Sequence, residues 1–182
     1  LQKMKESIEN KKFYVVSTNL KNGEPVYLEP SKQNIYKCLR ATSSLPFVTK
    51  GSCKINGLDL MDGGWSDPIP AKSAVNFGAN KIIVIRQNPL GYKINGLSYL
   101  GLLAGYWWRN NKQVSDNFFK EDNHYSKAVD FLKKKHKNIE IMQICPEKTL
   151  KSSVVGTSTE DLTQDYHSGL EKGMDFLNNI KD

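Results

Sequence analysis

The chain has 182 residues, of which 38% are hydrophobic and 25% are charged, and its formal net charge is +7 at pH 7. This size and apolar content predict one domain, residues 1–182, with a hydrophobic core of its own. No run approaches the roughly 20 apolar residues of a membrane-spanning helix, and no zinc-finger, RNA-binding or basic coiled-coil motif supports a nucleic-acid partner.

Residues 1–12 carry charge but no apolar segment, so a secretory signal peptide is not expected there. The first residue is Leu rather than Met, from which we expect a trimmed chain or a piece of a longer protein. Three cysteines, Cys38, Cys53 and Cys145, lie far apart and match no metal-ligand spacing. We expect free thiols in a reducing compartment, which predicts a cytoplasmic protein. Tyr106, Trp107 and Trp108 are of the types that favour the water–lipid boundary, which leaves peripheral contact with a membrane open beside core packing.

In chain order, the first predicted element is a strand over Lys12–Leu20, where β-branched and aromatic residues lie between polar flanks. A turn at Lys21–Pro25 leads to a short returning strand with the sequence VYLE. Ser31–Thr42 has apolar residues at helical spacing, and Ser31 stands in the position of an N-cap. The proline-containing segment Ser43–Phe47 ends this helix.

A β-hairpin is predicted over Cys53–Asp62, because Asn56-Gly57 suits the two positive-φ positions of a type I′ turn. Pro70–Ala79 is typical of a short helix that begins with proline. Lys81–Gln87 is a continuous apolar run, typical of a parallel strand that is covered on both faces.

The segment Leu97–Trp108 is apolar on nearly all sides, which fits a buried helix or an element that faces lipid. Further helices are predicted over Ser126–His136 and Asp161–Ile180, with a strand over Ile139–Pro146 between them. Alternating strands and helices predict an α/β fold, a three-layer α/β/α arrangement with a mostly parallel sheet. The last helix has one apolar stripe, formed by Leu162, Tyr166, Leu170, Met174 and Leu177.

The second arm of the hairpin ends in Asp62, followed by two glycines and a Pro-x-Pro corner. Glycines let the backbone turn sharply, and prolines fix φ beyond them, so the corner can present one carboxylate rigidly. The same pattern also occurs as a plain turn. Asp59 precedes Asp62 by three residues, so the two side chains should point to opposite faces, which argues against a paired-carboxylate site. Asp67 is expected to cap the loop rather than to bind a cation.

Three segments occur in an informative order: FYVVSTNLKNGEPVYL (Phe13–Leu28), ATSSLPFV (Ala41–Val48) and LMDGGWSDPIPAKSAVNFGANKIIVI (Leu60–Ile85). Together they resemble the second half of the patatin-like phospholipases, a family that includes bacterial serine esterases. In that family an Ala-Thr/Ser-Ser-x-x-Pro segment precedes a hairpin, which leads to Asp-Gly-Gly or Asp-Gly-Ala, a proline corner, a helix and an apolar strand. The tail, Ile141–Leu177, is similar to bacterial members, so the resemblance covers almost the whole chain.

The resemblance implies a lipid acyl hydrolase, a phospholipase or serine esterase, that uses a Ser-Asp dyad without histidine or cofactor. Carried over, the catalytic aspartate is Asp62, which acts as general base and orients the serine. Gly63 and Gly64 then form its supporting loop, and Ala41–Val48 lies near the site as structural support. The implied substrate is a lipid or a small ester.

Two parts of that site are missing from this sequence. No serine completes Gly-x-Ser-x-Gly, although Ser66, Ser98 and Ser158 each have the first glycine, and no glycine-rich loop offers an oxyanion hole. Loss of oxyanion donors alone costs about a hundred- to a thousand-fold in rate, so the chain by itself is expected to be inactive. Its expected partner is an N-terminal part of the same patatin-like domain, which carries the serine.

Other interpretations stay open on the sequence alone. The chain could be a non-catalytic module that binds a partner or a lipid surface, with the Asp62 corner serving only as a turn. The three histidines, His124, His136 and His167, lie far apart in polar helical segments and are expected at the surface. A Ser-His-Asp triad assembles in space rather than in sequence order, so the sequence leaves that arrangement open.

Overall fold

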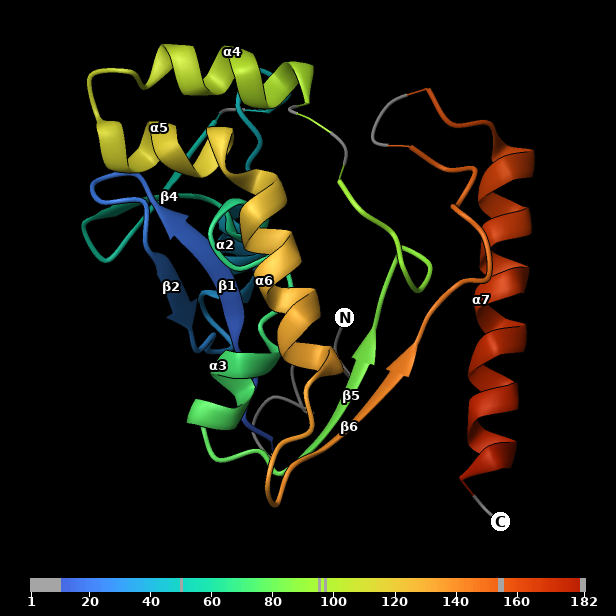
Figure 1. The fold of residues 1–182 in the computed structure, drawn as a ribbon. Coiled ribbons are helices and arrows are strands. Elements are labelled where there is room, and N and C mark those ends of the chain that lie inside the picture. The colour runs from blue at the N-terminus through green and yellow to red at the C-terminus, as the bar shows by residue number, and fades with distance from the viewer. Residues whose placement is uncertain (1–10, 50, 95, 97, 154–155, 181–182) are drawn as a thin grey trace. The chain divides into compact units, whose positions relative to one another are not determined.

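Strands and helices alternate along the chain in this computed structural model, which confirms a mixed α/β protein (Figure 1). The structure describes residues 11–49, 51–94, 96, 98–153 and 156–180. Leu97, where the sequence places the start of an apolar helix, lies outside the described residues. The chain divides into two compact units, which are described one at a time: unit 1 reaches to Pro70 and resumes over Ile94–Lys133, and unit 2 contains Ala71–Lys93 and Lys134–Asp182.

Unit 1 contains a four-stranded sheet with the strand order β2-β1-β4-β3. Every neighbouring pair is antiparallel, in contrast to the mostly parallel sheet that the alternation of elements predicts. Short turns join β1 to β2 and β3 to β4, and a tight turn can join only antiparallel strands. The central pair, β1 and β4, is connected through β2, α2 and β3 and is antiparallel as well. The hairpin prediction is confirmed, since Asn56 and Gly57 both have positive φ, 49° and 80°. The strands are β1 (Val15–Asn19), β2 (Pro25–Leu28), β3 (Cys53–Ile55) and β4 (Leu58–Asp62).

Helix α2 (Ile35–Thr42) covers one face of this sheet. It begins later than the sequence indicates, and Ser31 is not its N-cap. Ser31 instead closes a preceding turn, in which its N–H donates to Asn34 Oδ1 at 2.7 Å and its carbonyl accepts from Ile35 N–H at 3.0 Å. The core on this face is formed by Val15, Cys38, Ala41, Cys53, Ile55 and Leu60.

Three helices cover the other face of the sheet: α4 (Tyr99–Trp107), α5 (Lys112–Phe119) and α6 (Glu121–Lys133). The sequence does not predict α5, and α6 begins at Glu121 rather than at Ser126. Helix α5 is fastened to the β1–β2 turn, because Asn111 Nδ2 donates to Leu20 O at 3.1 Å and Asn117 Nδ2 donates to Gly23 O. The core on this face is formed by Met61, Trp65, Ala104, Val114 and Phe118. Leu60 and Met61 thus serve opposite cores, as neighbours in a strand do.

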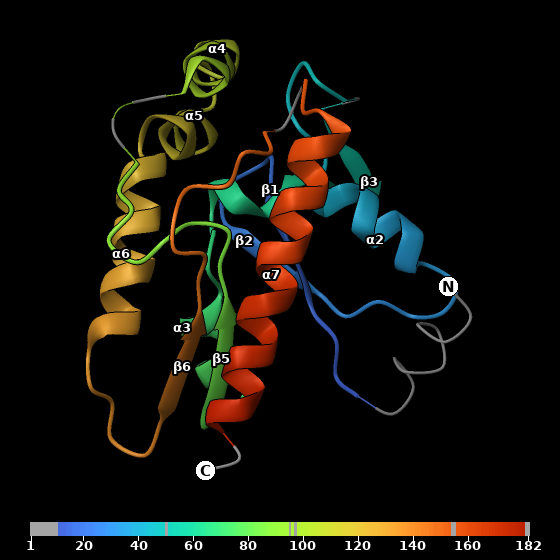
Figure 2. The ribbon, with the colours of Figure 1, turned by 90° about the vertical axis from the view of Figure 1, so that its right-hand side faces the viewer.

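Unit 2 pairs β5 (Lys81–Ile85) with β6 (Glu140–Ile144) in parallel, as expected of an α/β fold. Helices α3 (Ala71–Asn76) and α7 (Thr159–Asn179) complete the unit, and α7 contacts β6 (Figure 2). The expectation that β5 is covered on both faces is wrong. Ile82 and Val84 are buried, but the side chains of Ile83 and Ile85 are 50% and 79% exposed.

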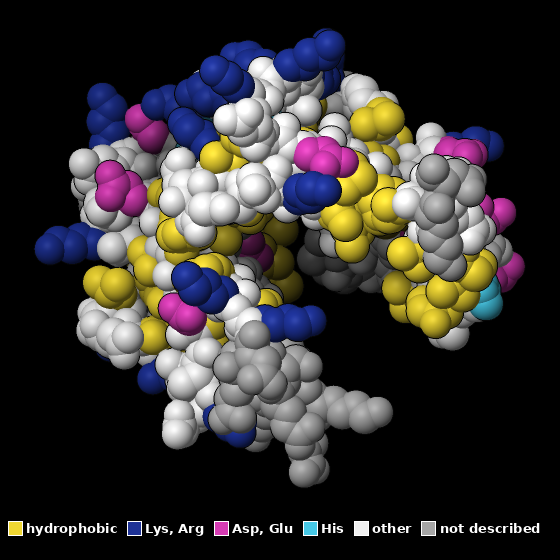
Figure 3. Space-filling view, turned by 90° about the horizontal axis from the view of Figure 1, so that it is seen from below, with side chains coloured by type: hydrophobic (Ala, Val, Ile, Leu, Met, Phe, Trp, Pro, Cys, Tyr) yellow, Lys and Arg dark blue, Asp and Glu magenta, His cyan; other side chains and the backbone are white. Residues whose placement is uncertain are grey.

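The apolar stripe of α7 is also uncovered. Its hydrophobic side chains gather along one side of the helix, with acidic side chains on another side (Figure 3). Helix α7 has no buried residue among those described. None of the helices in the described part of the chain has both the length and the apolar character that crossing a bilayer requires.

Candidate functional site

Strand β4 carries Asp62 to its carboxyl end, as the sequence predicts, and the neighbouring segments fix the backbone of that residue. Asp62 lies opposite Ser17 of β1 in the ladder. Its N–H donates to Ser44 O at 3.0 Å, and its carbonyl accepts from Thr18 Oγ1 at 2.7 Å. Ser44 belongs to the Ala41–Val48 segment, so that segment does contact the Asp62 corner. Three separate stretches of sequence therefore hold one residue in place.

The carboxylate of Asp62 turns back onto the loop that follows it. Its Oδ1 accepts from Gly64 N–H at 2.8 Å and caps the short 3₁₀ helix η1 (Gly63–Trp65). Asp62 is half-buried, and this burial raises the pKa of its carboxyl group above the ordinary value, against the lowering effect of the Gly64 N–H. A carboxylate with a raised pKa accepts a proton more readily, which suits a general base.

The first glycine after Asp62, Gly63, is required for space rather than for a special φ. A Cβ at Gly63 would lie 2.3 Å from Val16 O and 2.6 Å from Val16 C, so no other residue fits without moving β1. A Cβ at Gly64 would lie 3.1 Å from Asp62 Oδ1. The sequence-based expectation of a sharp turn thus identifies the right residues, but at Gly63 the physical reason is the close approach of two backbone segments.

A small polar network lies behind the corner on the opposite face of β1. Thr18 is buried, and its Oγ1 hydrogen-bonds both Asp62 O and Ser66 Oγ, the latter at 2.8 Å. Ser66 Oγ also donates to Gly63 O at 3.4 Å. The network connects the strand before the corner to the loop after it, and sequence reasoning does not identify Thr18 because it resembles any β-branched strand residue.

Replacing Thr18 with Val should destabilise the chain by about 1–3 kcal/mol, because the isosteric side chain leaves the buried Asp62 carbonyl and Ser66 hydroxyl without this partner. The measurement is urea unfolding of the 182-residue chain, followed by circular dichroism. Thr163→Val is the matched control, since Thr163 is exposed and bonds only within helix α7. Equal free energies of unfolding for the two variants would contradict the assigned role of Thr18.

Ser17 is a second residue that only the structure identifies. It is fully buried directly across the ladder from Asp62, and its Oγ has no hydrogen-bond partner within the described part of the chain. Cross-strand partners project to the same face of a sheet, so this hydroxyl lies on the side of Asp62. A buried hydroxyl without a hydrogen-bond partner lowers the stability of the fold. The position of the Ser17 hydroxyl on the side of the Asp62 carboxylate makes that side of the site polar.

Asp59 and Asp67, the other two acidic residues near the corner, do not form a paired-carboxylate site with Asp62. Asp59 faces away, as its strand position predicts, and forms an exposed ion pair with Lys54 at 3.6 Å. Asp67 accepts a hydrogen bond from Tyr27 Oη at 2.6 Å, and its N–H donates to Gly63 O at 2.9 Å, which confirms a role in holding the loop. Among residues with a described position, no group of three or more His, Cys, Asp or Glu side chains could hold a metal ion.

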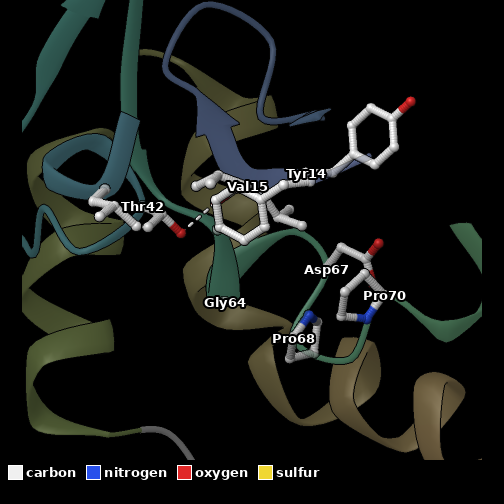
Figure 4. A pocket seen from close by; sticks show the side chains of 11 residues that line it. Tyr14, Val15, Thr42, Gly64, Asp67, Pro68 and Pro70 are labelled. Carbon is white, nitrogen blue, oxygen red and sulfur yellow. Dashed lines mark hydrogen bonds between the residues drawn. The ribbon is translucent and has the colours of Figure 1, made fainter. Parts of the chain in front are cut away.

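A pocket of about 330 Å³ lies beside the glycine loop, between the start of β1, helix α2 and the proline corner (Figure 4). Thr42 Oγ1 donates to Val16 O at its inner wall, while Pro68 and Pro70 form the opposite side. The pocket opens where β4 has left the sheet, so β1 has no neighbouring strand there on that side. The complete lining is Phe13, Tyr14, Val15, Val16, Leu39, Thr42, Gly63, Gly64, Asp67, Pro68 and Pro70.

No serine or histidine side chain donates a hydrogen bond to the Asp62 carboxylate in the described part of the chain, where its donor is Gly64 N–H. Ser17 lies across the ladder but does not bond the carboxylate. The carboxylate can therefore accept a proton from a group that approaches it.

Two comparisons with known proteins bear on this chain. Residues 111–182 match the model of a domain of unknown function, DUF6363. The chain is also 28% identical over 175 residues to the uncharacterized protein YjjU of Escherichia coli (strain K12), an alignment that covers 92% of the chain and 47% of that protein. The chain therefore spans about half the length of the curated relative it matches.

Proposed function

We propose that this chain is the C-terminal part of a patatin-like lipid acyl hydrolase, in which Asp62 is the base of a Ser-Asp dyad. The observation that carries the proposal is the Asp62 corner. There Ser44 and Thr18 hold the backbone of Asp62 at a strand end, and Gly64 N–H bonds its half-buried carboxylate, whose pKa is raised by burial.

In this mechanism a serine hydroxyl from the preceding part of the protein donates its hydrogen bond to the Asp62 carboxylate. Gly64 N–H occupies Oδ1, which leaves Oδ2 for the serine. Asp62 takes the hydroxyl proton while the serine oxygen attacks the ester carbonyl carbon, and it returns the proton to the departing alcohol. Water then cleaves the acyl-serine with the same carboxylate as base, and no cofactor takes part.

Exposed apolar surface in unit 2 supports the proposal that a preceding part of the protein packs against this chain. Within the described residues, strands β5 and β6 form a sheet of two strands, with Ile83 and Ile85 of β5 exposed, and two strands alone are at best marginally stable. Parallel strands normally lie within larger sheets that helices cover on both faces. We propose that the preceding part adds strands and completes a three-layer α/β/α sheet. The greater length of the curated relative is consistent with this.

The proposed substrate is an acyl ester of a lipid or of a small alcohol. The pocket beside Gly63 and Gly64 has apolar walls at Leu39, Pro68 and Pro70, and its volume of about 330 Å³ suits an acyl group of moderate length. Its position next to the loop that holds Asp62 would place such a group close to the ester carbonyl.

Labelling with a fluorophosphonate, a probe that reacts with activated serines, tests the proposal. The longer protein should take up one label, and peptide mass spectrometry should locate it on a serine outside residues 1–182. The separate 182-residue chain should take up none. A label on a serine of this chain would disprove the assigned division of the dyad. A folded longer protein that takes no label would favour a non-catalytic interaction module.

A further inference from the structure

Helix α4 of unit 1 buries its small residues and exposes its large apolar ones, the reverse of an ordinary surface helix. Its inner face consists of Gly101, Ala104 and Gly105, all buried. Its outer face carries large side chains at positions three and four apart, which is one side of a helix. These are Tyr99, Leu102, Leu103, Tyr106 and Trp107, exposed by 75%, 45%, 41%, 65% and 68%.

The inner face of α4 packs closely against α5, which leaves no room there for large aromatic side chains. A Cβ at Gly105 would lie 2.6 Å from the ring of Phe119 of α5, whereas the nearest atom to one at Gly101 is Ser98 Oγ of the N-cap of α4 itself. Ser115 Oγ also donates to Gly105 O at 2.8 Å within the buried interface with α5. The close approach of the two helices is therefore at Gly105, and it leaves the large side chains of α4 on the outside.

A second segment of unit 1 extends this exposed surface. The ring of Phe47 packs edge-on against Trp107 with a centroid distance of 5.9 Å, and Phe47 and Val48 are themselves 52% and 44% exposed. We call the five outer residues of α4 together with Phe47 and Val48 the α4 patch. It joins two stretches far apart in sequence into one aromatic and aliphatic surface, larger than the scattered apolar residues of an ordinary surface.

The two stretches of sequence that carry the α4 patch contain only basic charges, and one acid from elsewhere, Glu121 of α6, lies at the start of α4, where its carboxylate accepts from Ser98 Oγ at 3.4 Å. The sequence has no Asp or Glu from residue 30 to 58 or from residue 68 to 115, the stretches that contain the patch. Arg109 lies over the Tyr106 ring, 4.4 Å from its centroid, and Lys112 is exposed at the start of α5. The exposed stripe of α7 differs, because that helix carries Glu160, Asp161, Asp165, Glu171 and Asp175.

We propose that the α4 patch binds the surface of an anionic lipid bilayer. Trp and Tyr prefer the boundary between water and hydrocarbon, where an amphipathic ring keeps its polar group wet. Arginine and lysine beside them are attracted by anionic headgroups, whereas the acidic surroundings of the α7 stripe would be repelled. Binding through this surface does not require the chemistry of Asp62, so Asp62→Asn should leave it unchanged.

The test uses the 182-residue chain with vesicles of phosphatidylcholine alone and of phosphatidylcholine with 30% phosphatidylglycerol. Sedimentation should show binding that requires the anionic lipid. Of the three tryptophans, Trp65 is buried and Trp108 is half-buried in the core, so a change in emission reports on Trp107. Brominated lipids should quench this emission in the unmodified chain, a readout that needs no variant to fold.

A matched pair of variants then locates the surface. Tyr106 and Tyr166 are 65% and 66% exposed, so Tyr106→Ser and Tyr166→Ser remove the same side chain at the same exposure. Tyr106→Ser should weaken vesicle binding at least about five-fold, and Tyr166→Ser should stay within about two-fold of the unmodified chain. Arg109→Gln should cost about five-fold at low salt and less at high salt.

Three results would overturn the proposal. One is the absence of vesicle binding and of quenching. Another is equal weakening by Tyr106→Ser and Tyr166→Ser, which would show that the patch is not the contact surface. The third is a dimer in light scattering that Tyr106→Ser dissociates, together with no binding to anionic vesicles, which would assign the patch to a second copy of the chain.

Discussion

If the proposed function holds, replacing Asp62 with Asn is expected to abolish ester hydrolysis by the proposed longer protein while stabilising the fold at neutral pH. The amide oxygen can still accept from Gly64 N–H, so the geometry of the corner is kept. The amide cannot take the serine proton, and loss of a general base costs about 10²- to 10⁴-fold in rate. Hydrolysis of a p-nitrophenyl ester by the longer protein measures this loss.

The stability effect follows from the raised pKa of Asp62. The folded state binds the proton more tightly than the unfolded state does, so this group contributes stability fully below its unfolded pKa of about 3.9. That contribution is lost as the pH rises through the raised folded pKa, and above it the half-buried charge weakens the fold. Asp62→Asn should therefore unfold at a higher temperature than the unmodified chain at pH 7, and this advantage should disappear at acid pH.

Asp59→Asn is the control for both measurements. Asp59 has the same side chain on the same strand, but it is exposed and pairs with Lys54 at the surface. It should change neither the rate of hydrolysis nor the unfolding temperature at pH 7 appreciably. If Asp59→Asn and Asp62→Asn behaved alike, the assignment of the base to Asp62 would be wrong.

Replacing Gly63 with Ala should destabilise the chain by about 3 kcal/mol or more, at the upper end of the usual cost of overpacking. The added Cβ would collide with the carbonyl of Val16, 2.3 Å away. Val16 cannot retreat easily, because β1 is paired with β2 there and Thr42 donates to the same carbonyl oxygen. Thermal unfolding of the 182-residue chain should show a midpoint lower by about 6–12 °C.

Gly173→Ala is expected to raise the unfolding midpoint in the same experiment, the opposite of the effect of Gly63→Ala. Gly173 lies inside α7 with no atom within 4 Å of an added Cβ, so alanine should stabilise that helix by about 0.5–1 kcal/mol. Opposite signs for the two Gly→Ala changes would support the close approach of Gly63 to β1. An unchanged midpoint for Gly63→Ala would show that the two segments are further apart.

Local sequence signals predicted much of this chain. The hydrophobic pattern located β1, β4, β5, β6 and α7, and Asn56-Gly57 indicated its turn type, because a two-residue turn with two positive φ values accepts few other pairs. The position of Asp62 at the end of a strand also followed from the sequence. Helix α5 was missed since its polar residues, including Asn111 and Asn117, bond to the β1–β2 turn, a partner distant in sequence.

The sequence by itself therefore determined the strands, the hairpin and the place of the acidic corner, all of which depend on neighbours within a few residues. Only the tertiary structure decided what surrounds them. It showed that the sheet of unit 1 is antiparallel, that Ser44 and Thr18 hold Asp62, and that Gly63 is needed for contact with Val16. It also decided which face of α4 is buried. These features join residues distant in the chain, and close packing rather than local preference selects among the arrangements that one pattern permits.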